Sequence, residues 1–212
     1  MGTIFLVRHG ESTWNETGRY QGRIDTELSI RGQEQVALIA QRLRTVPVTA
    51  VYASPLRRAL HTAINVALPQ GLEVQVEPDL TEIDHGLWCG LLKEEVEKRF
   101  GPLLEMWYRA PAQVQMPGGE SLEVVRQRAM SVLARIQSQY PQEGTVICSH
   151  DAVIRVILLS VLGMDLNQFW SLSLENASLS VLSFGAEGTR LLAFNDTCHL
   201  GQHRSSAMDQ AL

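Results

Sequence analysis

The stretch Thr3-Ile-Phe-Leu-Val-Arg-His-Gly-Glu-Ser12 decides how this chain folds. Its first five residues are apolar or β-branched, which predicts a short buried strand over residues 3–7. The chain then becomes polar at once, with Arg8 and His9 directly after the strand. A second run, Thr145-Val-Ile-Cys-Ser-His150, repeats this pattern late in the chain. Ligand sites in open α/β sheets lie beyond the carboxyl ends of the strands, so the two histidines are expected to meet.

Between these two strands, short β-branched runs alternate with amphipathic stretches. This alternation predicts an α/β fold: a three-layer sandwich with a mostly parallel central sheet and helices on both faces. Ser54 followed by Pro55 predicts a capped helix that begins at Pro55. Further strands are expected at 50–53, 73–76, 179–184 and 190–194, and helices from near 29, over 55–68, over 91–109, from 121 and over 150–162.

The composition of the 212 residues, 45% hydrophobic and 19% charged, is that of a globular domain. We expect one domain over residues 1–212, in which residues 86–120 form a helical or lid subregion with a loop rich in proline and glycine. The formal net charge of −5 argues against a broad surface for nucleic acid, because phosphate backbones are bound by clustered lysine and arginine.

The three cysteines, Cys89, Cys148 and Cys198, are odd in number and widely spaced. They fit neither a disulfide framework nor a metal site, and they predict free thiols in the cytoplasm. The longest apolar stretches are too short to span a bilayer, so no membrane association is expected. An exposed edge strand or an apolar helix face is a potential basis for a homodimer.

Chemically versatile side chains follow the predicted strands. Arg57 and Arg58 lie at the start of the helix after residues 50–53, and Glu82 and His85 follow residues 73–76. Guanidinium groups bind pairs of phosphate oxygens, and a neutral imidazole is a nucleophile when its other nitrogen is held by a carbonyl. A buried carboxyl group with a raised pKa supplies a proton near neutral pH. If the carboxyl ends of these strands converge, the pocket that they form suits phosphate chemistry.

The chain resembles the histidine phosphatase superfamily, the phosphoglycerate-mutase-like enzymes, in six ordered blocks. The blocks that carry this resemblance are Leu6-Val-Arg-His-Gly-Glu-Ser-Thr-Trp-Asn15 with Tyr20-Gln-Gly22, Leu28-Ser-Ile-Arg-Gly32, Ser54-Pro-Leu-Arg-Arg58, Glu82-Ile-Asp-His-Gly86, Pro117-Gly-Gly-Glu-Ser121 and Ser149-His150. An isolated Arg-His-Gly is a weak signal, whereas ordered blocks over nearly the whole chain are a strong one.

The resemblance implies a role for each matching position. His9 matches the nucleophile that becomes phosphohistidine, and Glu82 matches the proton donor. Arg8, Arg58 and His150 match the groups that hold the phosphate. Asn15, Gln21 and Gly22 match groups that contact or cover it. The resemblance also implies catalysis without a metal or other cofactor.

Several residues have competing interpretations. Asp84 is an alternative to Glu82 as the acid. Arg57 has no matching role and is expected to be solvated, and His61 is expected on the helix surface. His199 and His203 are four residues apart, but no third ligand accompanies them, so a metal site is not expected. The tryptophans are interpreted as packing residues, with Trp107 and Tyr108 as the two aromatic residues to watch.

The blocks also bear on the substrate, which is expected to be a small phosphomonoester. The short passage from Gly86 to Pro117 favours hydrolysis over phosphoglycerate mutase activity. The resemblance is strongest to metal-independent phosphoserine phosphatases, with alpha-ribazole phosphatase as the main rival and a silent phosphate-binding regulatory protein as the non-enzymatic alternative. We expect His85, protonated or hydrogen-bonding, to meet a substrate carboxylate, and residues 195–203 to narrow the entrance. The role of the tail over residues 202–212 is left open.

Overall fold

The computed structural model describes residues 1–205. Its centre is a six-stranded sheet with the strand order β3-β2-β4-β1-β5-β6. The strands are β1 (Gly2–Arg8), β2 (Ala50–Ala53), β3 (Val74–Val76), β4 (Gly144–Ser149), β5 (Leu179–Gly185) and β6 (Gly188–Asp196). β1 to β4 are mutually parallel, and β5 and β6 form an antiparallel hairpin beside β1. The predicted, mostly parallel sheet is therefore confirmed.

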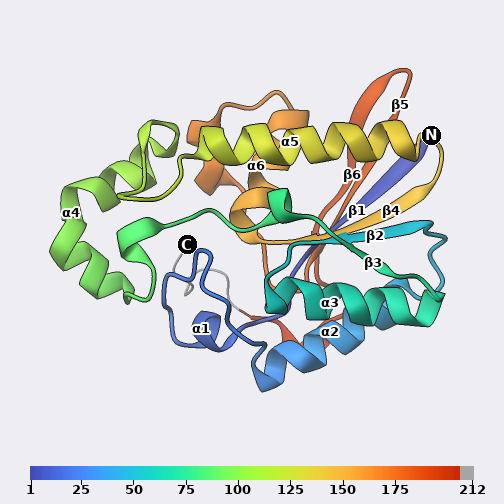
Figure 1. The fold of residues 1–212 in the computed structure, drawn as a ribbon, viewed down its shortest axis with the longest axis horizontal. Helices are drawn as coiled ribbons and strands as arrows, with labels where there is room; N and C mark the ends of the chain where they lie inside the picture. Colours follow the sequence, from blue (N-terminus) through green and yellow to red (C-terminus); the bar gives the residue numbers. More distant parts are fainter. Residues whose placement is uncertain (206–212) are drawn as a thin grey trace.

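Helices cover both faces of this sheet, as the three-layer prediction requires (Figure 1). α2 and α3 lie on one face, and α5 and α6 lie on the other. The α-helices are α1 (Thr13–Glu16), α2 (Ile30–Leu43), α3 (Arg57–Ala67), α4 (Lys93–Arg109), α5 (Leu122–Gln139) and α6 (Asp151–Val161). Short 3-10 helices span Leu68–Gln70, Pro78–Leu80, Gly86–Trp88, Pro111–Gln113, Leu166–Ser171 and Gly201–His203.

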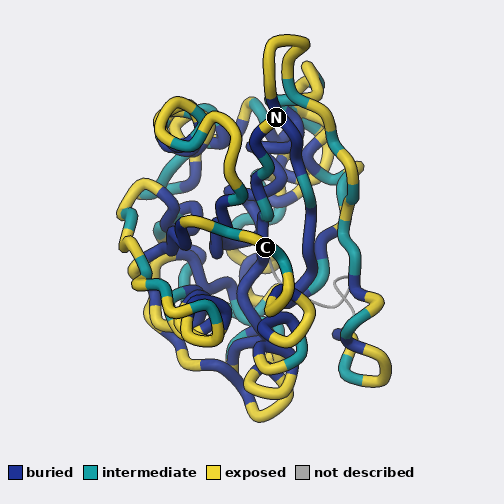
Figure 2. Tube along the Cα trace, turned by 90° about the vertical axis from the view of Figure 1, so that its right-hand side faces the viewer, coloured by how far each residue is buried: buried dark blue, intermediate teal, exposed yellow. Residues whose placement is uncertain are grey.

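The core has two parts because side chains alternate across the strands. In β1, Ile4 and Leu6 pack with α5 and α6, whereas Val7 packs with α2 and α3. Figure 2 shows the result as a buried centre surrounded by more exposed loops and outer helix surfaces. α6 is buried along most of its length, as its nearly continuous apolar sequence predicts.

The starts of the helices show which boundaries the local sequence determines and which it does not. Ser29 and Ser121 cap α2 and α5 through their hydroxyls, as expected. The predicted start of the third helix at Pro55 is wrong. α3 begins at Arg57 after Leu56, which makes no side-chain cap. The Ser54 hydroxyl still accepts from the N–H of Leu56 at 3.3 Å, and it also lies 2.7 Å from His150 Nε2, so it combines a local contact with a tertiary one.

The region from 86 to 120 extends away from the sheet as α4 and its flanking loops (Figure 1). α4 is kinked at Phe100, two residues before Pro102, whose ring cannot continue a regular helix. Trp107 near its end, which was set apart from the packing tryptophans, is buried against Phe169 and Trp170, so it is a packing residue as well.

Candidate active site

One small cavity of about 250 Å³ gathers most of the predicted site residues. It lies beside the carboxyl end of β1, where Arg8 and His9 are. Its lining consists of Arg8, His9, Asn15, Gln21, Gly22, Arg58, Glu82 and His85. His150 does not line the cavity, but it lies directly against His9.

His9 is held rigidly by the backbone around it. Its N–H donates to the Ser149 carbonyl at 3.0 Å, and its own carbonyl accepts from Ala177 N at 3.0 Å. Nδ1 lies 2.6 Å from the carbonyl oxygen of Gly10. A carbonyl oxygen only accepts, so Nδ1 carries the proton and Nε2 has the free lone pair.

The His9 ring is neutral near physiological pH. Burial is the main reason that its pKa lies well below the usual 6.5, and the positive charges of Arg58 and Arg8 lower it further. A neutral imidazole with a fixed tautomer has the properties that nucleophilic attack requires.

Backbone carbonyls orient the two cavity arginines. Arg58 Nη1 donates to Ile24 O and its Nη2 donates to Gly22 O, both at 2.8 Å. Arg8 Nη1 donates to Leu174 O at 2.6 Å. Burial lowers the pKa of Arg58 to about 10, which still leaves it charged at neutral pH. The cavity thus presents two buried, preoriented cations, which suits a phosphate dianion.

His150 forms a second imidazole layer behind His9. The two ring centroids are 5.1 Å apart in an edge arrangement, and His150 Nε2 lies 2.7 Å from Ser54 Oγ. Its pKa is well below the usual 6.5, first because of burial and then because of Arg58. The structure therefore brings the two histidines together, as the strand ends predicted.

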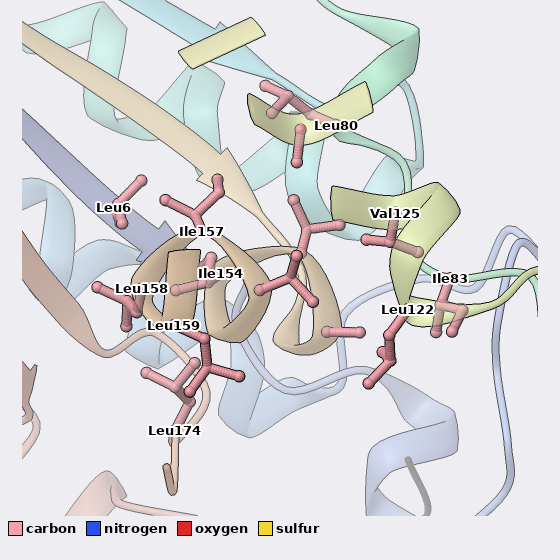
Figure 3. Close-up of a cluster of buried hydrophobic side chains, with 14 of the residues drawn as sticks. Leu6, Leu80, Ile83, Leu122, Val125, Ile154, Ile157, Leu158, Leu159 and Leu174 are labelled. Atoms are coloured by element: carbon pink, nitrogen blue, oxygen red, sulfur yellow. The ribbon is translucent and has the colours of Figure 1, made fainter. Parts of the chain in front are cut away.

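Glu82 is the titratable acid of the cavity. Burial and, secondly, the charge of Asp151 raise its pKa to about 7. Its Oε1 accepts from the N–H of Ile83 at 2.9 Å, and Ile83 packs in the core with Leu122 and Val125 (Figure 3). Asp84 does not line the cavity, and its carboxylate accepts from Gly86 N at 2.8 Å. The geometry therefore favours Glu82 over Asp84 as the acid.

His85 lines the cavity, but it is not a cation at neutral pH. Burial lowers its pKa to about 4, more than the negative charge of Asp84 raises it. Its ring packs edge-on against Tyr20 with centroids 5.3 Å apart, and it stacks on Trp88. The expectation of a protonated His85 is wrong because this aromatic setting excludes water. The hydrogen-bonding alternative agrees with its position.

Asn15 lies in α1, and Gln21 and Gly22 belong to the loop between α1 and α2. Asn15 Oδ1 accepts from Ser12 N at 3.0 Å, and Gln21 Oε1 accepts from the Thr26 hydroxyl at 2.7 Å. Gly22 has φ +51°, and a Cβ there would lie 2.7 Å from Cys89 Sγ. Only glycine combines this conformation with this close approach.

The segment expected to narrow the entrance lies elsewhere. Among the described residues, none of 195–205 lines the cavity. Instead, the His203 carbonyl and the Ser205 hydroxyl accept from Gln35 of α2, and His203 Nδ1 lies 2.9 Å from Glu34. Residues 206–212 of the tail lie outside the described part of the chain.

Three groups support the site in ways that the sequence motifs did not indicate. Asp151 contacts Arg8, Ser54 contacts His150, and Arg128 Nη2 donates to the Glu82 carbonyl at 3.2 Å. Asp151 and Arg155 are spaced i,i+4 on a helix, which is compatible with an ion pair, but their buried position depends on the fold.

The remaining predictions concern metals, thiols and membranes. In the described part of the chain, no cluster of three histidine, cysteine or carboxylate side chains forms a metal site, and His199 Nε2 lies 3.0 Å from the Ala177 carbonyl. Cys89, Cys148 and Cys198 are free thiols. Within residues 1–205, every helix is too short or too polar to cross a lipid bilayer.

The chain matches a known protein family along most of its length. The family described as histidine phosphatase superfamily (branch 1) matches residues 4–197. Phosphoserine phosphatase 1 of Hydrogenobacter thermophilus is 40% identical over 95% of this chain and 96% of that protein. A metal-independent phosphoserine phosphatase of Arabidopsis thaliana is 33% identical over 93% of this chain and 82% of its own length.

Solved structures share the same arrangement of the chain. A phosphoserine phosphatase mutant from Entamoeba histolytica in complex with phosphoserine aligns with a TM-score of 0.84 and 28% identity, covering 94% of this chain and all of that one. A structure described as a putative alpha-ribazole-5'-P phosphatase from Escherichia coli aligns with a TM-score of 0.83 and 26% identity, covering 92% of this chain and 96% of that one.

Proposed function

This chain belongs to the histidine phosphatase superfamily, and on that basis we propose that it hydrolyses small phosphomonoesters, preferring L-phosphoserine, through a phosphohistidine on His9. The observation that carries the proposal is the fixed tautomer of His9. Its Nδ1 donates to the Gly10 carbonyl in a cavity that also contains Arg8, Arg58 and Glu82.

In the first step, Nε2 of His9 attacks phosphorus, and the bond from phosphorus to the ester oxygen breaks. Arg8 and Arg58 balance the charge on the transferring phosphoryl group, and His150 lies close enough to His9 to assist them. Glu82 transfers its proton to the departing alkoxide. Its pKa of about 7 makes the protonated form available at neutral pH.

In the second step, the ionised Glu82 takes a proton from water as the water oxygen attacks the phosphohistidine. The bond from Nε2 to phosphorus breaks, and inorganic phosphate leaves. His9 returns to its neutral form, and Glu82 is again protonated. Each group therefore ends the cycle as it began, which is the balance that covalent catalysis requires.

Two observations support L-phosphoserine as the substrate. The relative at 40% identity is named a phosphoserine phosphatase. His85 on the cavity lining is placed to donate a hydrogen bond to the substrate carboxylate from a neutral ring. Hydrolysis would release L-serine, which would place the step in serine biosynthesis.

Alpha-ribazole phosphate is the second candidate, because a structure with that description has the same fold. It is less favoured because that structure shares 26% identity with this chain, against 40% for the relative named a phosphoserine phosphatase. A silent phosphate-binding protein is the less favoured alternative, since a pure binding protein needs neither a nucleophile of fixed tautomer nor an acid with a raised pKa.

We propose that the reaction needs no metal ion. The two guanidinium groups supply the positive charge that Mg²⁺ supplies in many phosphoryl-transfer enzymes. The name of the Arabidopsis relative, a metal-independent phosphoserine phosphatase, supports this proposal.

A screen of phosphomonoesters with and without excess EDTA tests the proposed function. The expected result is a higher kcat/KM for L-phosphoserine than for phosphothreonine, sugar phosphates or alpha-ribazole phosphate, unchanged by EDTA. Activity lost on chelation and restored by a divalent ion would contradict metal independence. A better rate with alpha-ribazole phosphate would contradict the substrate but leave the His9 mechanism intact.

We further propose a homodimer formed along β3, which is an edge strand. Leu68 and Val76 are exposed there, and Leu68 lines a shallow apolar groove with Ile64. Edge strands with apolar surroundings tend to pair with another chain. Leu68→Asp should shift the molecular mass in light scattering from dimer to monomer, whereas Leu192→Asp on the opposite edge should not.

The free thiols support a reducing compartment such as the cytoplasm.

A further inference from the structure

A buried carboxylate lies between two buried arginines next to the cavity. Asp151, the first residue of α6, has Oδ1 at 3.2 Å from Arg8 Nη1 and Oδ2 at 2.6 Å from Arg155 Nε. The side chains of Arg8 and Asp151 are 1% exposed, and that of Arg155 is 4% exposed. Solvent therefore screens these three charges very little.

The far end of this triad is fixed by packing. The Arg155 guanidinium lies over the ring of Phe169 at 4.9 Å and over that of Trp170 at 5.2 Å, measured to the ring centroids. Arg155 Nη1 also donates to the Phe169 carbonyl at 3.2 Å. Two aromatic faces and a carbonyl leave Arg155 little freedom, so the carboxylate that it binds is fixed as well.

The near end of the triad is a cavity residue. Arg8 Nη1 contacts both the Asp151 carboxylate and the Leu174 carbonyl, and Arg8 lines the cavity. Two acceptors on one nitrogen set the plane of the guanidinium, and this plane decides whether its fork matches two phosphate oxygens. Without the Asp151 carboxylate, the buried guanidinium groups of Arg8 and Arg155 would face each other with no negative charge between them, which is unfavourable in an interior that excludes water.

We propose that Asp151 is a positioning residue that holds the Arg8 guanidinium in its phosphate-binding orientation, with Arg155 fixing Asp151 from behind. This inference rests on the proposed function, in which Arg8 binds the phosphoryl group. Asp151 acts through Arg8 and has no direct role in the reaction.

The same carboxylate also affects the acid. Four charged groups face Glu82: Asp151 from α6, Arg58 from α3, Arg8 from β1, and Arg128 from α5, which binds the Glu82 carbonyl. Asp151 raises the pKa of Glu82, whereas Arg58 and Arg8 lower it. Removal of the Asp151 charge should therefore lower the pKa of Glu82, and the protonated acid should be lost at a lower pH.

A double-mutant cycle on the full chain tests the positioning role. D151N keeps the size of the side chain but removes its charge. With L-phosphoserine and p-nitrophenyl phosphate, we expect D151N to lower kcat/KM by about 10- to 100-fold, the range for a misplaced binding group. In the Arg8→Ala background, D151N should change kcat/KM for p-nitrophenyl phosphate, whose leaving group needs little help from Glu82, by less than about 3-fold, because the residue through which it acts is gone. The alkaline limb of the D151N profile should lie at lower pH.

An equal D151N loss in both backgrounds on p-nitrophenyl phosphate would overturn the proposal, since it would show an effect that does not pass through Arg8. Glu77→Gln is the control. Glu77 forms an ion pair with Arg135 and does not line the cavity, so the substitution removes a paired carboxylate away from the site. Its effect on kcat/KM should be the same with and without Arg8. Thermal melts check folding of each variant.

If D151N does not fold, Arg155→Lys serves in the same cycle, because it keeps the charge but loses the planar fork. A smaller loss that disappears in the Arg8→Ala background supports the proposal, and an equal loss in both backgrounds overturns it. Full activity of Arg8→Ala by itself would instead contradict the phosphate-binding role of Arg8 in the proposed function.

Discussion

The site draws its chemical groups from two differently built regions. The strand-end group comprises Arg8 and His9 at the end of β1, His150 directly after β4, and Arg58 in the first turn of α3, which follows β2. The loop group comprises Glu82 and His85, on the irregular segment between β3 and α4. Sheet register sets the positions of the first group, and loop-to-loop contacts set those of the second. In the proposed reaction, the first group binds the phosphoryl group that all substrates share, whereas the second meets the part of the substrate that varies.

Close backbone contacts hold the loop group in place. A Cβ at Gly86 would lie 2.1 Å from the Pro117 carbonyl, and one at Gly119 would lie 2.2 Å from the Asp84 carbonyl. The Glu120 carboxylate accepts from Asp84 N at 3.0 Å and pairs with Arg128. Two glycines thus let the loops touch, which explains why the Pro-Gly-Gly-Glu block accompanies the Glu82 block in the sequence.

The largest expected effect comes from the strand-end group. His9→Ala should lower kcat by about 10⁴-fold or more, since loss of a nucleophile removes the covalent route. Rapid acid-free quenching with labelled substrate should detect base-stable, acid-labile phosphate in the wild type and none in His9→Ala. A label that survives this substitution would show that the phosphoryl group is carried elsewhere.

Glu82→Gln is expected to have the next largest effect, and this effect should depend on the leaving group. Alkyl phosphates, whose alkoxides need a proton, should react about 10²- to 10⁴-fold more slowly. p-Nitrophenyl phosphate, with a stable leaving group, should lose much less. Equal losses on both substrates would make Asp84 the candidate acid.

The pH dependence of kcat/KM provides a second test of the difference between the strand-end group and the loop group. Attack needs neutral His9, whose pKa lies well below 6.5, and departure needs protonated Glu82, whose pKa is about 7. The kcat/KM for alkyl phosphates should therefore fall as pH rises through about 7, because Glu82 loses its proton. Glu82→Gln should abolish this alkaline limb while leaving the limb on the acid side.

His85→Ala should have a smaller and more selective effect. Loss of a hydrogen bond to a charged carboxylate is worth roughly 1.5–3 kcal/mol, or about one to two powers of ten in preference for L-phosphoserine. Hydrolysis of p-nitrophenyl phosphate should change little. Because the pKa of His85 is about 4, the preference should stay constant from pH 8 to pH 5; an increase on acidification would indicate a protonated ring.

The smallest effect is expected at Arg57, beside Arg58 in the sequence. Arg57 is half-exposed and pairs with Asp25 and Glu27 at the surface, whereas Arg58 is fully buried on the cavity. Exposed ion pairs contribute about 0–1 kcal/mol, so Arg57→Gln should lower stability by no more than that and leave kcat/KM within about 2-fold. Arg58→Gln in the same assay is the matched comparison and should lose phosphate affinity.

Local sequence was sufficient for much of the fold. The alternation of strands and helices, the Ser29 and Ser121 caps and the buried α6 all follow from patterns within one element. The second contact of the Ser54 hydroxyl, with His150, lies 96 residues away in the sequence. A residue pattern contains no record of such a partner.

Arg8, His9 and Arg58 were predictable because they lie at or just after strands, and parallel strands present their carboxyl ends on one edge of the sheet. Asn15, Gln21 and Gly22 were predicted only from the resemblance to the family. The charge states of the cavity residues could not be predicted from the sequence. His85 is neutral because Tyr20, Trp88 and Trp107 exclude water around it, and these rings come from three separate segments. The sequence by itself determined which side chains reach the cavity. Only the tertiary structure decided their pKa values and the role of Asp151, because burial and the distance between charges exist only once distant segments have packed together.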